Sequence, residues 1–313
     1  MPRSESKPFM NQVVKRPCPV CSVSEVSTVG PILHPRPALV AGVALELGGT
    51  EYWLRECRRC GFQFKDPPIP AERLMECYAR ATSDNWETDP DPHQRQFDVL
   101  RGLLETHASG RRVLDVGCFN GALLGYLGDG WQRYGVEPSQ AAAELARRRH
   151  VEVLAPSLEE LGRDTEPFDA IIATDVVEHI VEPMPFFQQV RDLLAPGGIV
   201  LLLTGDSRAL AWRLQGGLYW YCSLPEHVSF YSKGTLDWIG DSLGLRGIEY
   251  RRLCHKRLPR RQWYTDMAKS AAYIAGRRVR GFGIPSLRRL FVERRGPSIA
   301  TAQDHLIYMY RKE

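Results

Sequence analysis

Apolar residues in the middle of the chain fall either into short continuous runs or into helically spaced positions. The runs at 112–116, 168–174 and 199–204 are mainly apolar, which is typical of strands buried on both faces of a parallel sheet. Segments with helical periodicity separate them. Helices are therefore expected at 71–81, 93–107, 140–149 and 233–243, and further strands at 131–137, 151–154, 245–253 and 304–311. Strands that alternate with helices predict an α/β fold with a mainly parallel sheet.

The strand at 112–116 runs into a glycine-bearing turn that opens a helix. Gly117 and Gly121 lack a Cβ, so their backbone can approach a ligand closely. The first turn of the helix offers unpaired N–H groups to a carboxylate or a phosphate. Phe119 stands where the pattern G-x-G-x-x-G has its second glycine, which favours an amino-acid carboxylate over a pyrophosphate. Cys118 is expected to contribute its backbone only.

Two acidic residues end consecutive strands. Asp115 lies at the end of the first strand, and Glu137 follows 22 positions later at the end of the second. The carboxyl ends of parallel strands meet at one edge of the sheet, where α/β folds bind ligands. Glu137 is placed to hold the two hydroxyl groups of a ribose. Together with the glycine turn, these residues predict a nucleoside-like cofactor.

Two further motifs follow: the sequence DVVEHI at 175–180, and a Pro-Gly-Gly turn at 196–198 before the strand at 199–204. Over about 99–207, these features in this order resemble class I S-adenosylmethionine-dependent methyltransferases. The resemblance implies a seven-stranded Rossmann-like sheet and S-adenosylmethionine as the cofactor. A plain dinucleotide-binding domain is the rival interpretation.

The same resemblance gives roles to residues beyond the turn. It places Ser157 and Leu158, just past the third strand, where the adenine is held. It places Asp175 at the cofactor pocket or the substrate entrance, with a strand-end role as the alternative. His179, at the end of the expected DVVEHI strand, is interpreted mainly as a structural histidine near the cofactor.

Two C-x-x-C pairs lie near the N-terminus, Cys18 with Cys21 and Cys57 with Cys60. Two such turns can place four thiolates tetrahedrally around one Zn²⁺. The 35 residues between the pairs suit a ribbon with an inserted hairpin. A redox-active C-x-x-C normally begins a helix in a βαβ unit, and neither pair does. A structural zinc site in a reducing compartment is therefore expected.

A zinc ribbon followed by a methyltransferase resembles a group of bacterial enzymes that methylate sugars and polysaccharide precursors. In that group an aromatic residue after the ribbon lies over the cofactor and substrate; Tyr78 matches it, and packing on the core is the alternative. The segment at 219–232 resembles the HEHVSYFS segment of sugar C-methyltransferases. Glu226 and His227 match the pair that acts on substrate protons, whereas Pro225 replaces the first histidine. This departure favours methyl transfer to oxygen over transfer to carbon. The alternative for His227 is a purely structural role, as a buried histidine hydrogen-bonded to the backbone.

Charge is distributed unevenly along the chain. The net charge is +4, yet 251–295 carries 14 Lys and Arg against two acidic residues. Two apolar helix faces are predicted within it, one formed by Trp263, Met267 and Ile274 and one by Leu287, Leu290 and Phe291. Basic amphipathic helices contact anionic membranes, grip substrate phosphates, or pack as a flap on their own domain. These three alternatives stay open, and nucleic acid is the less favoured anionic partner.

The sequence predicts a zinc-ribbon domain at 1–70, a helix and linker at 71–92, and a methyltransferase domain at 93–313 with a basic helical insert at 251–295. The expected reaction is methyl transfer to a hydroxyl of a sugar or glycoconjugate acceptor, carried on a phosphate or a lipid. The alternatives are a sugar C-methyltransferase on a nucleotide-linked ketosugar, a natural-product O-methyltransferase acting for example on a quinone-like phenol, and a non-catalytic RNA- or ligand-binding module. A polar start without a signal-peptide pattern predicts a cytoplasmic protein, with peripheral contact at the inner membrane face as an extension.

Overall fold

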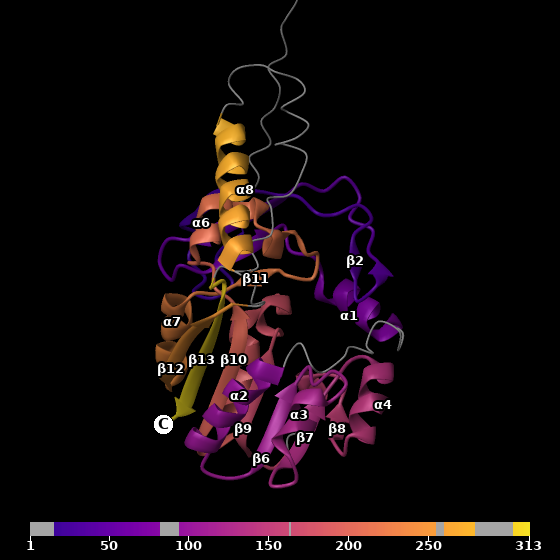
Figure 1. The fold of residues 1–313 in the computed structure, drawn as a ribbon. Helices are drawn as coiled ribbons and strands as arrows, with labels where there is room; N and C mark the ends of the chain where they lie inside the picture. Colours follow the sequence, from indigo (N-terminus) through magenta and orange to yellow (C-terminus); the bar gives the residue numbers. More distant parts are fainter. Residues whose placement is uncertain (1–15, 82–93, 163, 255–259, 279–302) are drawn as a thin grey trace, which may run out of the picture.

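Seven strands form the main sheet of the computed structural model, which describes residues 16–81, 94–162, 164–254, 260–278 and 303–313. In chain order they are β6 (Arg112–Val116), β7 (Gln132–Val136), β8 (Glu152–Ala155), β9 (Phe168–Thr174), β10 (Leu194–Gly205), β12 (Leu245–Leu253) and β13 (His305–Lys312). Their spatial order is β12-β13-β10-β9-β6-β7-β8 (Figure 1). β13 is antiparallel to both of its neighbours, and the strands from β10 to β8 are parallel. The predicted α/β fold with a seven-stranded sheet is confirmed.

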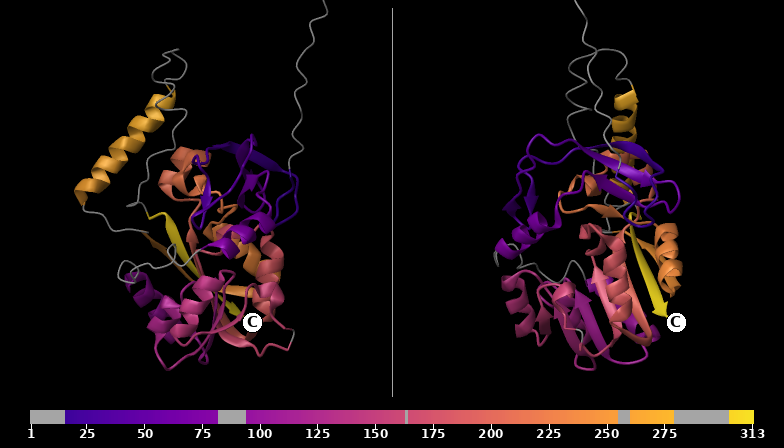
Figure 2. Two further views of the ribbon diagram at one scale, coloured as in Figure 1. Left: turned by 90° about the vertical axis from the view of Figure 1, so that its right-hand side faces the viewer. Right: turned by 180° about the vertical axis from the view of Figure 1, so that it is seen from behind.

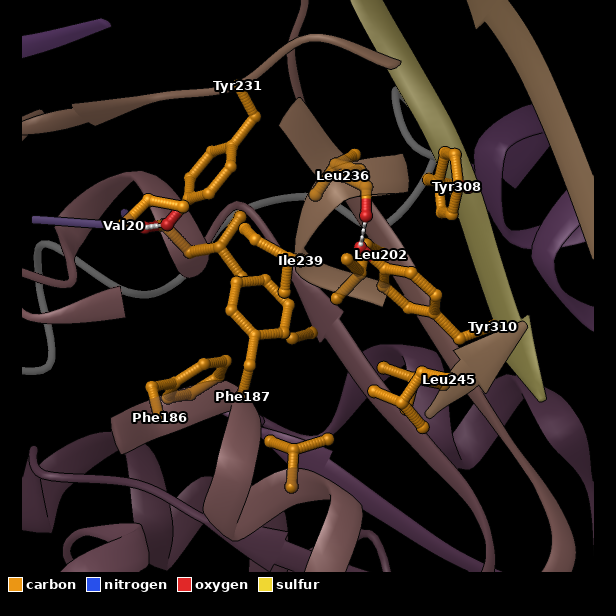
Figure 3. Packing of buried hydrophobic residues seen from close by; sticks show 14 of the residues in the cluster. Val20, Phe186, Phe187, Leu202, Tyr231, Leu236, Ile239, Leu245, Tyr308 and Tyr310 are labelled. Atoms are coloured by element: carbon orange, nitrogen blue, oxygen red, sulfur yellow. Dashed lines mark hydrogen bonds between the residues drawn. The ribbon is translucent and has the colours of Figure 1, made fainter. Parts of the chain in front are cut away.

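Helices cover both faces of this sheet. One face packs against α2 (Gln94–His107), α3 (Ala122–Leu127) and α4 (Gln140–Arg148), and the other against α5 (Pro183–Asp192) and α7 (Lys233–Leu243). Successive strand residues point to opposite faces, so Ile171 and Ile172 belong to different apolar clusters. Figure 3 shows the second face, where Phe187 of α5 lies among Leu236 and Ile239 of α7. Burial on both faces explains the continuous apolar runs of the sequence.

A second, antiparallel sheet joins the N-terminal region to the main domain. Its strands, in spatial order, are β1 (Val26–Ile32), β4 (Tyr52–Cys57), β5 (Gln63–Asp66) and β11 (Ser229–Phe230). β2 (Leu39–Val40) and β3 (Val43–Ala44) form the hairpin predicted between the cysteine pairs, and α1 (Ala71–Arg80) follows the ribbon. These N-terminal elements lie above one end of the main sheet (Figures 1 and 2). Because β11 comes from the distant C-terminal half, the two regions share a sheet.

The DVVEHI segment is not a strand, contrary to the sequence prediction. β9 ends at Thr174, and Val177–His179 forms a 3₁₀ turn, η4. Asp175 has φ 52°, in the left-handed region that a strand cannot contain. This turn redirects the chain over the end of the sheet, so that His179 faces the N-terminal region instead of the strand's neighbours.

The basic insert is only partly described. β12 extends to Leu253, inside the predicted insert, and α8 (Arg260–Arg278) is a helix as expected. Its buried residues are Asp266, Ser270 and Tyr273. Of the predicted apolar face, Met267 packs against a core cluster and Ile274 is half-buried, whereas Trp263 is 39% exposed. Leu287, Leu290 and Phe291 lie outside the described residues.

Candidate active site

The turn after β6 has the left-handed backbone that its glycines permit. φ is 69° at Gly117, 53° at Phe119 and 74° at Gly121. A Cβ on Gly121 would lie 2.9 Å from the Cα of Ala146, so this glycine allows α4 to pack closely. The missing Cβ of Gly121 thus serves helix packing, and the cofactor role expected for its backbone stays a prediction. A Cβ on Gly117 would meet the side chain of Val176 at 2.8 Å.

The two predicted acidic residues meet across this turn. Glu137 accepts hydrogen bonds from the backbone N–H groups of Phe119 (2.9 Å) and Ser139 (2.8 Å). Asp115 is 3% exposed, and its Oδ1 has no hydrogen-bond partner among the described residues. Burial, followed by the negative charge of Glu137, raises the pKa of Asp115 well above its usual value. A buried carboxylate oxygen without a donor fits a ligand that brings hydroxyl or ammonium donors, as S-adenosylmethionine does.

The remaining predicted cofactor residues lie at the same edge or beside it. Ser157 is half-buried and begins a 3₁₀ turn, η3 (Leu158–Glu160), directly after β8. The side chain of Leu158 is buried in the core cluster beneath. The side chain of Cys118 is buried too, and the N–H groups of Gly117 and Cys118 both donate to the carbonyl of Val136. The roles given to these residues stay predictions.

Three side chains from distant segments meet beside this edge. The hydroxyl of Tyr78, on α1, lies 2.7 Å from Nδ1 of His179. The rings of His179 and His227 are 4.9 Å apart and nearly perpendicular. The structure therefore connects the two separate candidates Tyr78 and His227 through His179.

His227 is oriented by its backbone contact. Its Nδ1 lies 3.1 Å from the carbonyl oxygen of Tyr221, which can only accept a hydrogen, so Nδ1 carries the hydrogen and Nε2 is the acceptor. Burial lowers the pKa of His227 well below its usual value, and the neighbouring His179 and Lys65 add to the effect. Burial also lowers the pKa of His179 to about 4. Both imidazoles are thus neutral near pH 7.

Glu178 is a residue that sequence reasoning missed. It is fully buried, and its carboxylate accepts hydrogen bonds from the hydroxyls of Thr204 (2.8 Å) and Tyr221. Its own backbone carbonyl accepts from the N–H of Val228. Burial raises the pKa of Glu178 to about 7. Glu178 therefore fastens the segment around His227 to the end of β10, a role that only the assembled fold makes visible.

Glu226 lies next to this cluster. Its Oε2 is buried and has no hydrogen-bond partner among the described residues. Burial raises the pKa of Glu226, while the charge of Lys65 opposes the shift. The ligand atoms of Glu178, His179 and His227 lie within 4.8 Å of one another, but two hydroxyls already occupy the Glu178 oxygens. The cluster is therefore better suited to proton transfer than to holding a metal ion.

The four N-terminal cysteines form one group. Their sulfur atoms lie within 4.8 Å of one another, with Cys18 and Cys60 3.6 Å apart and Cys21 and Cys57 3.4 Å apart. Four sulfurs bound tetrahedrally to zinc at about 2.3 Å would be roughly 3.8 Å from one another. The hydrogen bond with Cys60 lowers the pKa of Cys18 to about 5. The arrangement fits a Zn²⁺ ion with four thiolate ligands.

Residues 93–250 match the family model described as a methyltransferase domain. The chain belongs to this family. The prediction of a class I S-adenosylmethionine-dependent methyltransferase is thereby confirmed as to family. The matched residues contain the glycine turn, both acidic strand ends and the segment around His227.

Two curated relatives are ubiquinone biosynthesis O-methyltransferases. The one from Alkalilimnicola ehrlichii is 32% identical over 139 residues, which are 41% of this chain and 53% of the relative. The mitochondrial one from Bos taurus is 33% identical over 133 residues, which are 37% of this chain and 36% of the relative. The chain thus spans about half or less of the length of these relatives. These relatives are named for ubiquinone biosynthesis, whereas the sequence motifs resemble those of sugar-modifying methyltransferases.

Among solved structures, the chain is similar to the N-methyltransferase NodS from Bradyrhizobium japonicum in complex with S-adenosyl-L-homocysteine. The identity is 15%, the TM-score is 0.48, and the match covers 78% of this chain and 99% of NodS. Across the described residues, no helix combines the length and the apolar character needed to cross a bilayer.

Proposed function

We propose that the protein transfers a methyl group from S-adenosylmethionine to a hydroxyl of a small acceptor, and that His227 takes the hydroxyl proton. One observation carries this proposal: Nδ1 of His227 donates to the carbonyl of Tyr221, which leaves Nε2 as a proton acceptor inside the protein. A hydroxyl becomes a good nucleophile as it loses its proton, and histidine is the commonest base for this step.

The edge formed by β6 and β7 would hold the cofactor, whose sulfonium supplies the methyl group when bound. Asp115 offers an unpartnered oxygen, and Glu137 spans the turn at the place expected for the ribose. The buried surroundings of His227 exclude water, which keeps the proton acceptor neutral and protects the methyl donor from hydrolysis.

The acceptor is proposed to be a phenolic hydroxyl, as in a quinol. A histidine with a lowered pKa is a weak base, so it favours an acidic hydroxyl. A phenol has a pKa of about 10, whereas an aliphatic hydroxyl is closer to water, at about 16. The ubiquinone O-methyltransferases among the relatives support this class of acceptor. Tyr78 and Trp220 are only partly buried in the apolar cluster that contains Tyr221, and we propose that their rings contact a planar substrate.

A sugar hydroxyl is the second candidate, because Glu226 and His227 match the pair found in sugar-modifying methyltransferases. A competition assay separates the two. The protein is incubated with isotopically labelled S-adenosylmethionine and an equimolar mixture of a catechol and a nucleotide-linked ketosugar, and the products are analysed by mass spectrometry. We expect the label on the phenolic oxygen. Label on a sugar oxygen or carbon would show that the acceptor is the sugar and not the phenol. RNA binding without any labelled product would favour a non-catalytic binding module.

We also propose that Cys18, Cys21, Cys57 and Cys60 hold a structural Zn²⁺ ion. A closed four-thiolate site contributes to folding instead of catalysis. Elemental analysis should find one zinc per chain. Cys57→Ser should lose the metal and several kcal/mol of unfolding free energy, whereas Cys254→Ser, outside the ribbon, should keep both. Full metal content in Cys57→Ser would contradict the site.

The cytoplasmic location stays a prediction. Peripheral membrane contact through 251–295 is a further proposal, and it rests on the positive charge of this segment. Trp263 and Tyr264 of α8 are exposed and lie next to basic residues in the sequence. Flotation with vesicles that contain anionic lipid tests this contact, and binding that persists after Arg261 and Lys269 are replaced by glutamine would argue against an electrostatic origin.

A further inference from the structure

A lysine from the N-terminal ribbon lies inside the protein beside the proposed acceptor site. Lys65, on β5, is 1% exposed. Its ammonium donates hydrogen bonds to the backbone carbonyls of Leu224 (2.9 Å) and Pro225 (3.1 Å). No carboxylate of the described residues forms a salt bridge with it. Burial without a paired charge lowers the pKa of Lys65 to about 7, and the two hydrogen bonds fix the position of its amine group.

Both carbonyls belong to the residues directly before Glu226 and His227. On the far side of this pair, the backbone N–H of Lys65 donates to the carbonyl of Val228 (2.9 Å). The neighbouring residue, Phe64, pairs with Ser229 between β5 and β11. A single residue of the ribbon therefore holds the loop at 224–228 on both sides of its two chemically active side chains.

The loop has a second anchor on the main domain. The N–H of Val228 donates to the carbonyl of Glu178, and the carboxylate of Glu178 accepts from Tyr221, whose carbonyl orients His227. Glu178 thus reaches the loop from the sheet side and Lys65 from the ribbon side. Without Lys65, the carbonyls of Leu224 and Pro225 would lose the donors that keep them buried.

We propose that Lys65 is a positioning residue for the acceptor site, and that through it the ribbon sets the position of Glu226 and His227. The inference rests on the proposed function, because the loop matters as the carrier of the base. Under this proposal the ribbon forms one wall of the acceptor site and is not a separate appended module. The cofactor edge, which Lys65 does not touch, should be independent of it.

Lys65→Met tests the proposal, because methionine retains much of the volume while removing both donors. We expect hydrogen–deuterium exchange in the peptide 224–230 to become at least about tenfold faster, with exchange at 113–137 unchanged. Affinity for S-adenosylhomocysteine should stay within about twofold, while kcat falls by at least about tenfold. Lys233→Met, at an exposed lysine paired with Asp237, is the matched control and should leave the exchange rates, the affinity and kcat unchanged.

Unchanged exchange at 224–230, or an equal increase throughout the chain, would overturn the positioning role. If the methionine variant does not fold, Lys65→Gln, which keeps N–H donors on a shorter side chain, should still raise the exchange rate at 224–230, though by less than about tenfold. If the unaltered protein methylates no acceptor, the proposed function fails, and the exchange measurement still decides whether Lys65 holds the loop.

Discussion

The cofactor edge, formed by the ends of β6 and β7, and the acceptor site, formed around His227, are built in different ways. The edge takes Asp115, Gly117 and Glu137 from one short stretch of chain, and its contacts are between neighbouring strands and turns. The acceptor site takes Tyr78, His179 and His227 from segments that are far apart in sequence. A site built locally can keep its geometry while a site assembled from distant parts is altered. The four predictions below separate the two regions.

The largest effect is expected at the acceptor site. His227→Gln should lower kcat by about 10²- to 10⁴-fold, because it removes the proposed base. Its affinity for S-adenosylhomocysteine, measured by calorimetry, should be unchanged. His150→Asn is the control, since His150 is exposed and has the left-handed backbone that asparagine tolerates. A fall of less than threefold in kcat would remove His227 from the mechanism.

At the cofactor edge, Asp115→Ala should weaken cofactor binding by about 10- to 100-fold, the equivalent of one hydrogen bond to a charged group. The same calorimetric titration measures it. Asp129→Ala, at a fully exposed side chain, should bind as the unaltered protein does. Equal affinities for all three proteins would place the cofactor elsewhere.

The pH dependence should reveal the buried histidines. A lowered pKa keeps an imidazole neutral as the pH falls, so the base form is lost only when the pH passes through the folded-state value. The acid limb of kcat/KM should therefore have its midpoint well below 6.5, because burial lowers the pKa of His227 well below its usual value. Circular dichroism at each pH controls for unfolding, because a lowered histidine pKa also contributes stability that is lost as the pH falls. A midpoint near 6.5 in folded protein would mean that the base is solvent-exposed.

The smallest effect is expected at Tyr78. Tyr78→Phe removes the hydrogen bond to Nδ1 of His179 and keeps the ring, so kcat/KM should fall by about fivefold. Cofactor affinity should not change, which again separates the two regions. A loss of more than about a hundredfold would mean that the hydroxyl takes a direct part in the chemistry.

Much of the fold was predictable because its signals are local. The apolar runs became β6, β9 and β10, and the glycine-bearing turn after β6 opens a helix as expected. The 3₁₀ turn after β9 was missed because it follows Asp175, whose left-handed backbone conformation has no clear sequence signal. The burial of Asp266 and Ser270 on α8 was missed because polar side chains carry no apolar signal in the sequence.

The candidate site was predictable only in part. His227 and Tyr78 carry motif signals, so the sequence singled them out. Glu178 and Lys65 look like ordinary charged residues in the sequence. Their burial depends on partners in other segments, such as Tyr221 for Glu178 and Leu224 for Lys65. Such contacts follow from the tertiary arrangement and not from spacing along the chain.

The central claim is that the edge formed by β6 and β7 binds S-adenosylmethionine. Titration calorimetry of zinc-loaded protein with S-adenosylmethionine and with S-adenosylhomocysteine tests it most directly. We predict one site per chain, with a dissociation constant between about 1 µM and 1 mM. No binding heat and no competition by either compound, in protein shown to be folded, would contradict the account.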